Sequence, residues 1–268
     1  MRNRQVCLFL SLAAVFLAPM ASLPGLFPMR AACLPQSHPQ VTVAAAISMK
    51  DVLEAIASLY GRRKGAPDVT LTFGASGILE KQIEQGAPVD VFISAAPAQM
   101  NALEKQVLLL EGTRRDIAGN RLVLVVPRGT TVVHTLEDLK KPAVRTIAMG
   151  EPRAVPAGQY AAEALRHLGL FDALESKFVY AQDVRAVLTY VAGGDADAGF
   201  VYETDAESSG NVTIAAAAPA GSYTPVVYPA AVVRSSQNPT AAKYYLDYLS
   251  SAEARAMFEK YGFTTPAK

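Results

Sequence analysis

From Val41 onward, short apolar runs typical of β-strands alternate with longer stretches in which apolar residues recur every three or four positions. The run from Val41 to Ala46 is followed by an amphipathic stretch from Met49 to Tyr60. A second unit joins the run Val69–Phe73 to the stretch Gly77–Gln85. Each unit therefore predicts a strand followed by a helix. Repeated units of this kind predict a parallel sheet covered by helices.

The same alternation continues to the C-terminus, but its character changes near Asn120. Before this point, the run Val89–Ser94 predicts a strand and Gln99–Lys105 a helix; after it, a fully apolar strand begins at Leu122. The later strands are expected at Leu122–Pro127, Thr146–Met149, Phe178–Tyr180, Ala198–Tyr202, Thr213–Ala218 and Tyr228–Val233, and the later helices at Gln159–Leu168, Thr240–Leu249 and Glu253–Tyr261.

This order predicts an α/β fold of two lobes, each a mainly parallel sheet flanked by helices, with crossing connections and a ligand cleft between the lobes. We expect residues 41–119 together with 222–268 to form the first lobe, and residues 120–221 to form the second. In open α/β sheets, ligands bind at the carboxyl ends of the strands, where loops lead into helix N-termini. The functional residues are therefore expected in those loops.

The N-terminus has the pattern of a secretory signal. Arg2 and Arg4 precede an apolar run from Val6 to Ala18, which is followed by small residues and prolines. The run is shorter than the ~20 residues that a membrane-spanning helix needs. We expect residues 1–32 to be a signal peptide with no sharp cleavage site and the protein to be periplasmic, with an uncleaved membrane anchor as the alternative.

The two cysteines predict a mature protein with no internal disulfide. Cys7 lies inside the expected signal peptide, which leaves Cys33 without a partner. Cys33 is either a free thiol or a site of lipid attachment, although Arg30 occupies a position where lipoprotein signals prefer an aliphatic residue.

The charge balance and the missing motifs argue against several classes of function. The 25 Lys and Arg residues nearly balance the 24 Asp and Glu residues, so nothing indicates a surface for nucleic acid. The three histidines, at positions 38, 134 and 167, belong to no metal-binding or nucleophile motif. We therefore expect a protein that is not an enzyme, has no cofactor, and has no site for a free metal cation.

Two of the predicted strand-to-helix loops are suited to anion binding. Ser48 follows the first strand and Ser76 the second, and the loops that carry them consist mainly of small residues. Gly74 and Gly77 allow the backbone to approach a ligand closely. Hydroxyls and free N–H groups at such helix starts bind anions. The alternative is that both serines are simple N-caps, the role that Asp183 is expected to have in the second lobe.

The string from Phe73 to Ala95 (FGASGILEKQIEQGAPVDVFISA) resembles the signature region of periplasmic molybdate-binding proteins of ABC transporters, which are type II periplasmic binding proteins. The resemblance runs in order from Val41 to the C-terminus. It includes the segments at 44–48, 150–158, 183–185, 199–202 and 228–233.

The resemblance implies a set of ligand-binding residues. In that family, two serine hydroxyls, backbone amides and a tyrosine hydroxyl hold the oxyanion. By motif position these groups are the hydroxyls of Ser48 and Ser76, the amides of Ala157 and Val184, and the hydroxyl of Tyr202. Ile47 stands where the family often has a serine or an alanine, so it either narrows the pocket mouth or packs. The resemblance also implies a monomer that delivers its ligand to a membrane permease.

The chemistry of these groups suits molybdate and, at nearly the same size, tungstate. Molybdate is a dianion without a proton, so its oxygens only accept hydrogen bonds, and a site made of donors satisfies them. Hydrogenphosphate carries a proton that such a site leaves without an acceptor. Sulfate is also fully ionised, so a sulfate receptor stays open as an alternative. An enzyme on the same fold, such as a porphobilinogen-polymerising deaminase, would need a cysteine in the body of the chain.

Overall fold

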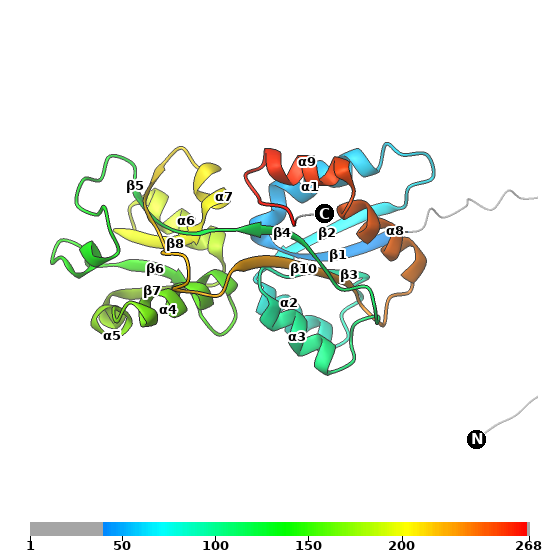
Figure 1. Ribbon diagram of the computed structural model, residues 1–268, viewed down its shortest axis with the longest axis horizontal. Coiled ribbons are helices and arrows are strands. Elements are labelled where there is room, and N and C mark those ends of the chain that lie inside the picture. The colour runs from blue at the N-terminus through cyan, green and yellow to red at the C-terminus, as the bar shows by residue number, and fades with distance from the viewer. Residues whose placement is uncertain (1–39, 267–268) are drawn as a thin grey trace, which may run out of the picture. The chain divides into compact units, whose positions relative to one another are not determined.

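The computed structural model describes residues 40–266, which form two five-stranded mixed sheets flanked by helices (Figure 1). The expected signal peptide and both cysteines lie outside the described residues. The expected α/β class with two lobes is confirmed. We call the first sheet with its helices the first lobe, and the second sheet with its helices the second lobe. The lobe boundaries expected from the sequence stay a prediction.

The first sheet has the strand order β2-β1-β3-β10-β4. Strands β2, β1 and β3 run parallel, and β10 runs antiparallel to both β3 and β4, so a single strand is reversed. The strands are β1 (Gln40–Ala46), β2 (Asp68–Gly74), β3 (Val91–Ile93), β4 (Arg115–Asn120) and β10 (Val226–Val232).

Helices cover both faces of the first sheet. Figure 1 shows α2 and α3 on one face and α1, α8 and α9 on the other. The core beneath α2 and α3 contains Leu79, Phe92 and Met100, all almost fully buried. The helices are the 3-10 turn η1 (Ile47–Met49), α1 (Lys50–Tyr60), α2 (Ser76–Glu84), α3 (Pro97–Lys105), α8 (Pro239–Leu249) and α9 (Ala252–Lys260).

The second sheet repeats this plan with the order β7-β6-β8-β5-β9. Strands β7, β6 and β8 are parallel, and β5 is antiparallel to both of its neighbours. The strands are β5 (Leu122–Pro127), β6 (Ile147–Gly150), β7 (Phe178–Ala181), β8 (Ala198–Tyr202) and β9 (Val212–Ala217). The helices are η2 (Glu137–Lys140), α4 (Pro156–His167), α5 (Phe171–Leu174), η3 (Glu175–Lys177), α6 (Val184–Gly193) and α7 (Glu203–Glu207).

The chain crosses between the two sheets twice. It passes from β4 to β5 at Asn120 and Arg121, and it returns from β9 to β10 through residues 218–225. One continuous core of buried apolar side chains includes residues of both sheets, among them Val43 and Phe200. No helix of the described part of the chain is long and apolar enough to cross a membrane.

Two local predictions are corrected by the structure. Strand β4 has no counterpart among the expected strands, because the segment RDIAGN at 115–120 lacks an apolar run. It becomes a strand by pairing with β10 and, at Gly119, with Thr264. Helix α4 begins at Pro156 rather than at Gln159. Proline is favoured at the first helical position, since its missing N–H has no acceptor there.

Candidate anion-binding site

In the first lobe, three parallel strands end at one place. Ser48 follows β1, Ser76 follows β2, and Ala95 follows β3 shortly after its last residue, Ile93. Because β1 pairs with both β2 and β3 in parallel, the carboxyl ends of all three strands lie at the same edge of the sheet. The topology therefore brings both predicted serines to one site.

The second lobe contributes its three parallel strands in the same way. Ala157 follows β6 after a short loop, Val184 follows β7, and Tyr202 is the last residue of β8. The two lobes thus present six parallel strand ends, and the five predicted residues all stand at such ends.

These residues line one small cavity with about 200 Å³ of empty space. This is less than the volume of about 300 to 1,000 Å³ that is usual for pockets holding a drug-sized organic ligand. None of its lining residues carries a charged side chain. The lining consists of Ala46, Ile47, Ser48, Gly74, Ala75, Ser76, Ala95, Val155, Pro156, Ala157, Val184 and Tyr202. The structure therefore brings all five predicted residues together, and their contact with a ligand stays a prediction.

Neither serine is an N-cap, so the capping alternative is wrong. Ser48 is the middle residue of η1, and Ser76 is the first residue of α2, whose N-cap is Ala75. No side chain caps either element. By contrast, the Asp183 carboxylate accepts a hydrogen bond of 2.9 Å from the Ala186 N–H, as expected of an N-cap. The two serine hydroxyls are therefore available for another role.

Each serine oxygen accepts or shares one hydrogen bond with the protein. The Ala95 N–H donates to Ser76 Oγ at 3.0 Å, and Ser48 Oγ lies 3.1 Å from Tyr228 Oη. Both serines are almost fully buried. The hydroxyl groups are thus fixed in place while they line the cavity.

Two backbone amides at the cavity belong to first turns of helices. Val184 is the first residue of α6 and Ala157 the second residue of α4. An N–H group at either position has no acceptor within its own helix. The partial positive charge of a helix N-terminus adds to this preference for a negative ligand.

Tyr202 brings a buried hydroxyl that lacks a protein partner. The residue is 1% exposed, and its Oη makes no hydrogen bond within residues 40–266. Burial raises the pKa of Tyr202 well above its ordinary value, so the hydroxyl keeps its proton. A buried donor without an acceptor is costly unless a ligand supplies one.

Ile47 has one of the two roles that the sequence left open, because it packs against the core. It lines the cavity, and it also packs against the main core as a partly buried residue. That it narrows the mouth of the pocket stays a prediction.

Charged groups lie beside this cavity rather than in it. A neighbouring pocket shares Ser48 and is also lined by Asp51 and Arg185. Arg185 Nη2 lies 2.7 Å from Asp51 Oδ2 across the lobes, and Arg185 Nε lies 2.8 Å from Asp205 Oδ1. The second contact is close but poorly aligned as a hydrogen bond. Burial raises the pKa of Asp205 to about 7, although Arg185 lowers it.

Direct contacts hold the lobes together around the cavity. The Gly77 N–H donates to the Ala154 carbonyl at 2.9 Å, and Tyr160 Oη donates to the Ala95 carbonyl at 3.2 Å. Both contacts join the first lobe to the second next to the cavity, since Ala95 is itself one of its lining residues.

The structure adds two residues that sequence reasoning missed, Asn120 and Tyr228. Tyr228 contacts Ser48, and Asn120 contacts Tyr228 from the crossing between the lobes. Tyr228 begins one of the strings that carried the family resemblance, which was the single available signal. Neither residue lies in a strand-to-helix loop. They were therefore not found by searching the loops at the carboxyl ends of strands, which is how the serines were found.

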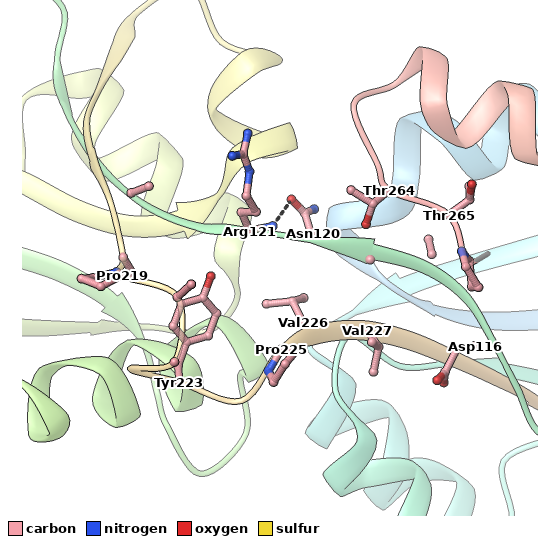
Figure 2. A pocket seen from close by; sticks show the side chains of 17 residues that line it. Asp116, Asn120, Arg121, Pro219, Tyr223, Pro225, Val226, Val227, Thr264 and Thr265 are labelled. Atoms are coloured by element: carbon pink, nitrogen blue, oxygen red, sulfur yellow. Dashed lines mark hydrogen bonds between the residues drawn. The ribbon is translucent and has the colours of Figure 1, made fainter.

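A larger groove lies along the crossing segments and contains none of the five predicted residues (Figure 2). Its lining includes Tyr223, Pro225 and Thr264. The cation at its edge, Arg121, is already paired with Glu203, with Nε and Oε2 2.7 Å apart. The groove is therefore a weaker candidate for anion binding than the small cavity. Within residues 40–266, no group of three or more His, Cys, Asp or Glu side chains is placed to hold a metal ion.

Comparisons with known proteins agree with this geometry. Residues 41–264 match the family described as bacterial extracellular solute-binding protein. A Bacillus subtilis protein described as a substrate-binding lipoprotein of an ABC transporter, YvgL, is 41% identical, and the match covers 84% of this chain and 86% of the relative. The molybdate-binding protein ModA of Escherichia coli is 38% identical, with 84% and 89% covered.

A solved structure supports the same relationship. The periplasmic molybdate-binding protein of Azotobacter vinelandii superposes with a TM-score of 0.76 at 29% identity, and the match covers 85% of this chain and all of that one. The resemblance inferred from the sequence is confirmed. The chain belongs to the family of bacterial extracellular solute-binding proteins and is related to its molybdate-binding members.

Proposed function

We propose that this protein captures molybdate, and tungstate as well, in the cavity between its lobes and delivers it to the permease of an ABC transporter. The observation that carries the proposal is the donor set: two hydroxyls, two helix-terminal amides and the Tyr202 hydroxyl line a space without a charged side chain. Molybdate-binding relatives at 37% and 38% identity support the choice of ion.

Neutral donors suffice for a dianion in such a site. Hydrogen bonds to a charged acceptor are each worth about 1.5 to 3 kcal/mol, and they gain strength where water is excluded. Because no side-chain cation is involved, affinity should depend less on salt than that of an arginine-based site. The ion is a cargo, so the site needs no catalytic group and no resident cofactor.

The proposed cellular role follows from the family. Its members are extracellular by description, which supports an exported protein that meets its permease at the membrane. We expect the protein to act as a monomer. The signal peptide at residues 1–32 and a lipid tether at Cys33 stay predictions. Sulfate is the competing ligand, because it too is fully ionised.

Calorimetric titration of the purified exported protein tests the proposal. We expect one tight site for molybdate and for tungstate, and weak responses to sulfate and phosphate. A Ser48→Ala/Ser76→Ala double variant removes two charge-assisted hydrogen bonds, ~3 to 6 kcal/mol, so affinity should fall by about 100-fold or more. Ser235→Ala/Ser250→Ala, two changes outside the cavity, is the matched control. Tight sulfate binding without a molybdate response would overturn the assignment.

A further inference from the structure

We propose that Asn120 and Tyr228 are positioning residues that force the Ser48 hydroxyl to donate into the cavity, so that the site discriminates against oxyanions that carry a proton. The inference rests on the proposed function and adds a selectivity mechanism to it. It depends on the direction of a hydrogen-bond chain that starts at the crossing between the lobes.

The direction is set at Asn120 by a backbone group. The Arg121 N–H donates to Asn120 Oδ1 at 2.9 Å, the contact drawn as a dashed line in Figure 2. A backbone N–H can only donate, so this side of the amide must be the oxygen. The Asn120 Nδ2 group therefore faces the other way and donates to Thr204 Oγ1 at 2.9 Å and to Tyr228 Oη at 3.3 Å.

Tyr228 in turn determines the direction of the hydrogen bond that it makes with Ser48. The residue is fully buried between the rings of Tyr202 and Phe263, and burial raises the pKa of its hydroxyl, which therefore keeps its single hydrogen. Asn120 donates to Tyr228 Oη, so it cannot accept the Tyr228 hydroxyl hydrogen. This hydrogen is therefore donated to Ser48 Oγ, which lies 3.1 Å from Tyr228 Oη. The Ser48 hydrogen is then not used by Tyr228 and is available to a ligand in the cavity, which Ser48 lines.

The Ser76 oxygen also accepts a hydrogen bond, in this case directly from a backbone N–H. The Ala95 N–H donates to Ser76 Oγ at 3.0 Å, and a backbone N–H has no acceptor role. Both serine oxygens are thus engaged by donors, and both hydroxyl hydrogens are left for the ligand. At Ser76 the orienting donor is backbone, while at Ser48 it is a side chain that substitution can remove.

This arrangement discriminates by protonation state. Molybdate and sulfate carry no proton near neutral pH, so they accept from both serines. Hydrogenphosphate has the same double charge at about pH 8 but needs an acceptor for its proton, and a serine whose hydrogen is given to the ligand and whose oxygen already accepts one hydrogen bond is a poor acceptor for it. Sulfate and hydrogenphosphate are close in size, so the ratio of their affinities reports the proton rather than the fit.

The test is a Tyr228→Phe variant, which keeps the buried ring and removes the hydroxyl that orients Ser48. Molybdate, sulfate and phosphate affinities are measured at about pH 8, the weaker two by displacement of molybdate. We expect about a tenfold loss of molybdate affinity and a sulfate-to-phosphate ratio that falls about tenfold, because the freed Ser48 hydroxyl can rotate and accept. Equal losses for both anions, or no change in the ratio, would overturn the inference.

An Asn120→Asp variant tests the chain independently and serves if Tyr228→Phe folds poorly. A carboxylate accepts where the amide donated, so Tyr228 turns its hydrogen toward position 120 and Ser48 turns its own toward Tyr228. The added charge repels both dianions alike, so the sulfate-to-phosphate ratio isolates the reversal, and it should fall at least as far as in Tyr228→Phe. An unchanged ratio would contradict the chain.

Tyr245→Phe is the matched control. Tyr245 is a fully buried tyrosine of the first lobe whose hydroxyl has no hydrogen-bond partner in the described part of the chain, and it does not line the cavity. Its removal should leave the molybdate affinity and the anion ratio unchanged. Failure of the wild-type protein to bind molybdate would instead refute the proposed function, which keeps the two failures distinguishable.

Discussion

Gly77 and Ala154 come from different lobes and touch through their backbones, with the Gly77 N–H 2.9 Å from the Ala154 carbonyl oxygen. A Cβ atom added at Gly77 would lie 2.7 Å from that oxygen and 2.9 Å from the Ala154 Cα. Real Cβ atoms do not approach backbone so closely. The close approach of the lobes at this point therefore requires a glycine.

Gly77→Ala should weaken ligand binding by about tenfold or more, because a cost of about 1.4 kcal/mol on closure corresponds to a factor of ten. Gly210→Ala is the control, since a Cβ there meets nothing within 4 Å. Titration gives the affinities, and small-angle scattering with ligand reports closure. A Gly77→Ala variant with wild-type affinity would show that the contact is dispensable.

Val184→Pro should remove one donor while α6 is kept. Val184 is the first residue of that helix and follows an extended residue, Asp183, which is the setting that proline accepts. We expect molybdate affinity to fall about tenfold, with little change in the far-ultraviolet circular dichroism. Ala252→Pro makes the same change at the start of α9, away from the cavity, and should leave affinity intact. Similar affinity for both variants would exclude the Val184 amide as a ligand.

Asp51→Asn should loosen the closed state slightly. The Asp51–Arg185 ion pair joins the lobes at 2.7 Å, but its side chains are 46% and 26% exposed. A pair this exposed contributes up to about 1 kcal/mol, so we expect an affinity loss of up to about fivefold that shrinks as salt is added. Asp247→Asn breaks a surface pair with Arg115 within the first lobe and should not change binding. An effect of Asp51→Asn that is independent of salt would contradict the electrostatic explanation.

Asp205 should make stability depend on pH. Its side chain is fully buried, and burial raises its pKa from 3.8 to about 7 despite Arg185. Between these two values the folded protein binds more protons than the unfolded chain, so the Asp205 contribution is present at low pH and is lost as pH rises through about 7.

Urea unfolding of the wild type and of Asp205→Asn, from about pH 5 to pH 8, measures this contribution. The free energy of unfolding of the wild type, relative to the variant, should decrease as pH rises through this window. Asp247→Asn, at an exposed carboxylate, should show no such trend. A difference that stays flat would mean that Arg185 keeps Asp205 ionised throughout.

Much of the fold follows from local pattern. Strands such as β1 and β8 and helices such as α1 carry the period of their structure within a few residues, so their order and the α/β class were predictable. The edge strand β4 was not, because its six residues contain no apolar run and its pairing partner, β10, is more than a hundred residues away.

The sequence by itself determined the strand-to-helix units, the export pattern and, through a family resemblance, the five residues that line the cavity. The tertiary structure alone decided that these residues meet, since they come from both lobes. The proposed direction of the Ser48 hydroxyl also depends on tertiary contacts, because Ser48 and Tyr228 are 180 residues apart, and Tyr228 and Asn120 are 108 residues apart. Local sequence encodes periodicity and helix starts, but the direction of a hydrogen bond depends on groups that only the folded chain brings together.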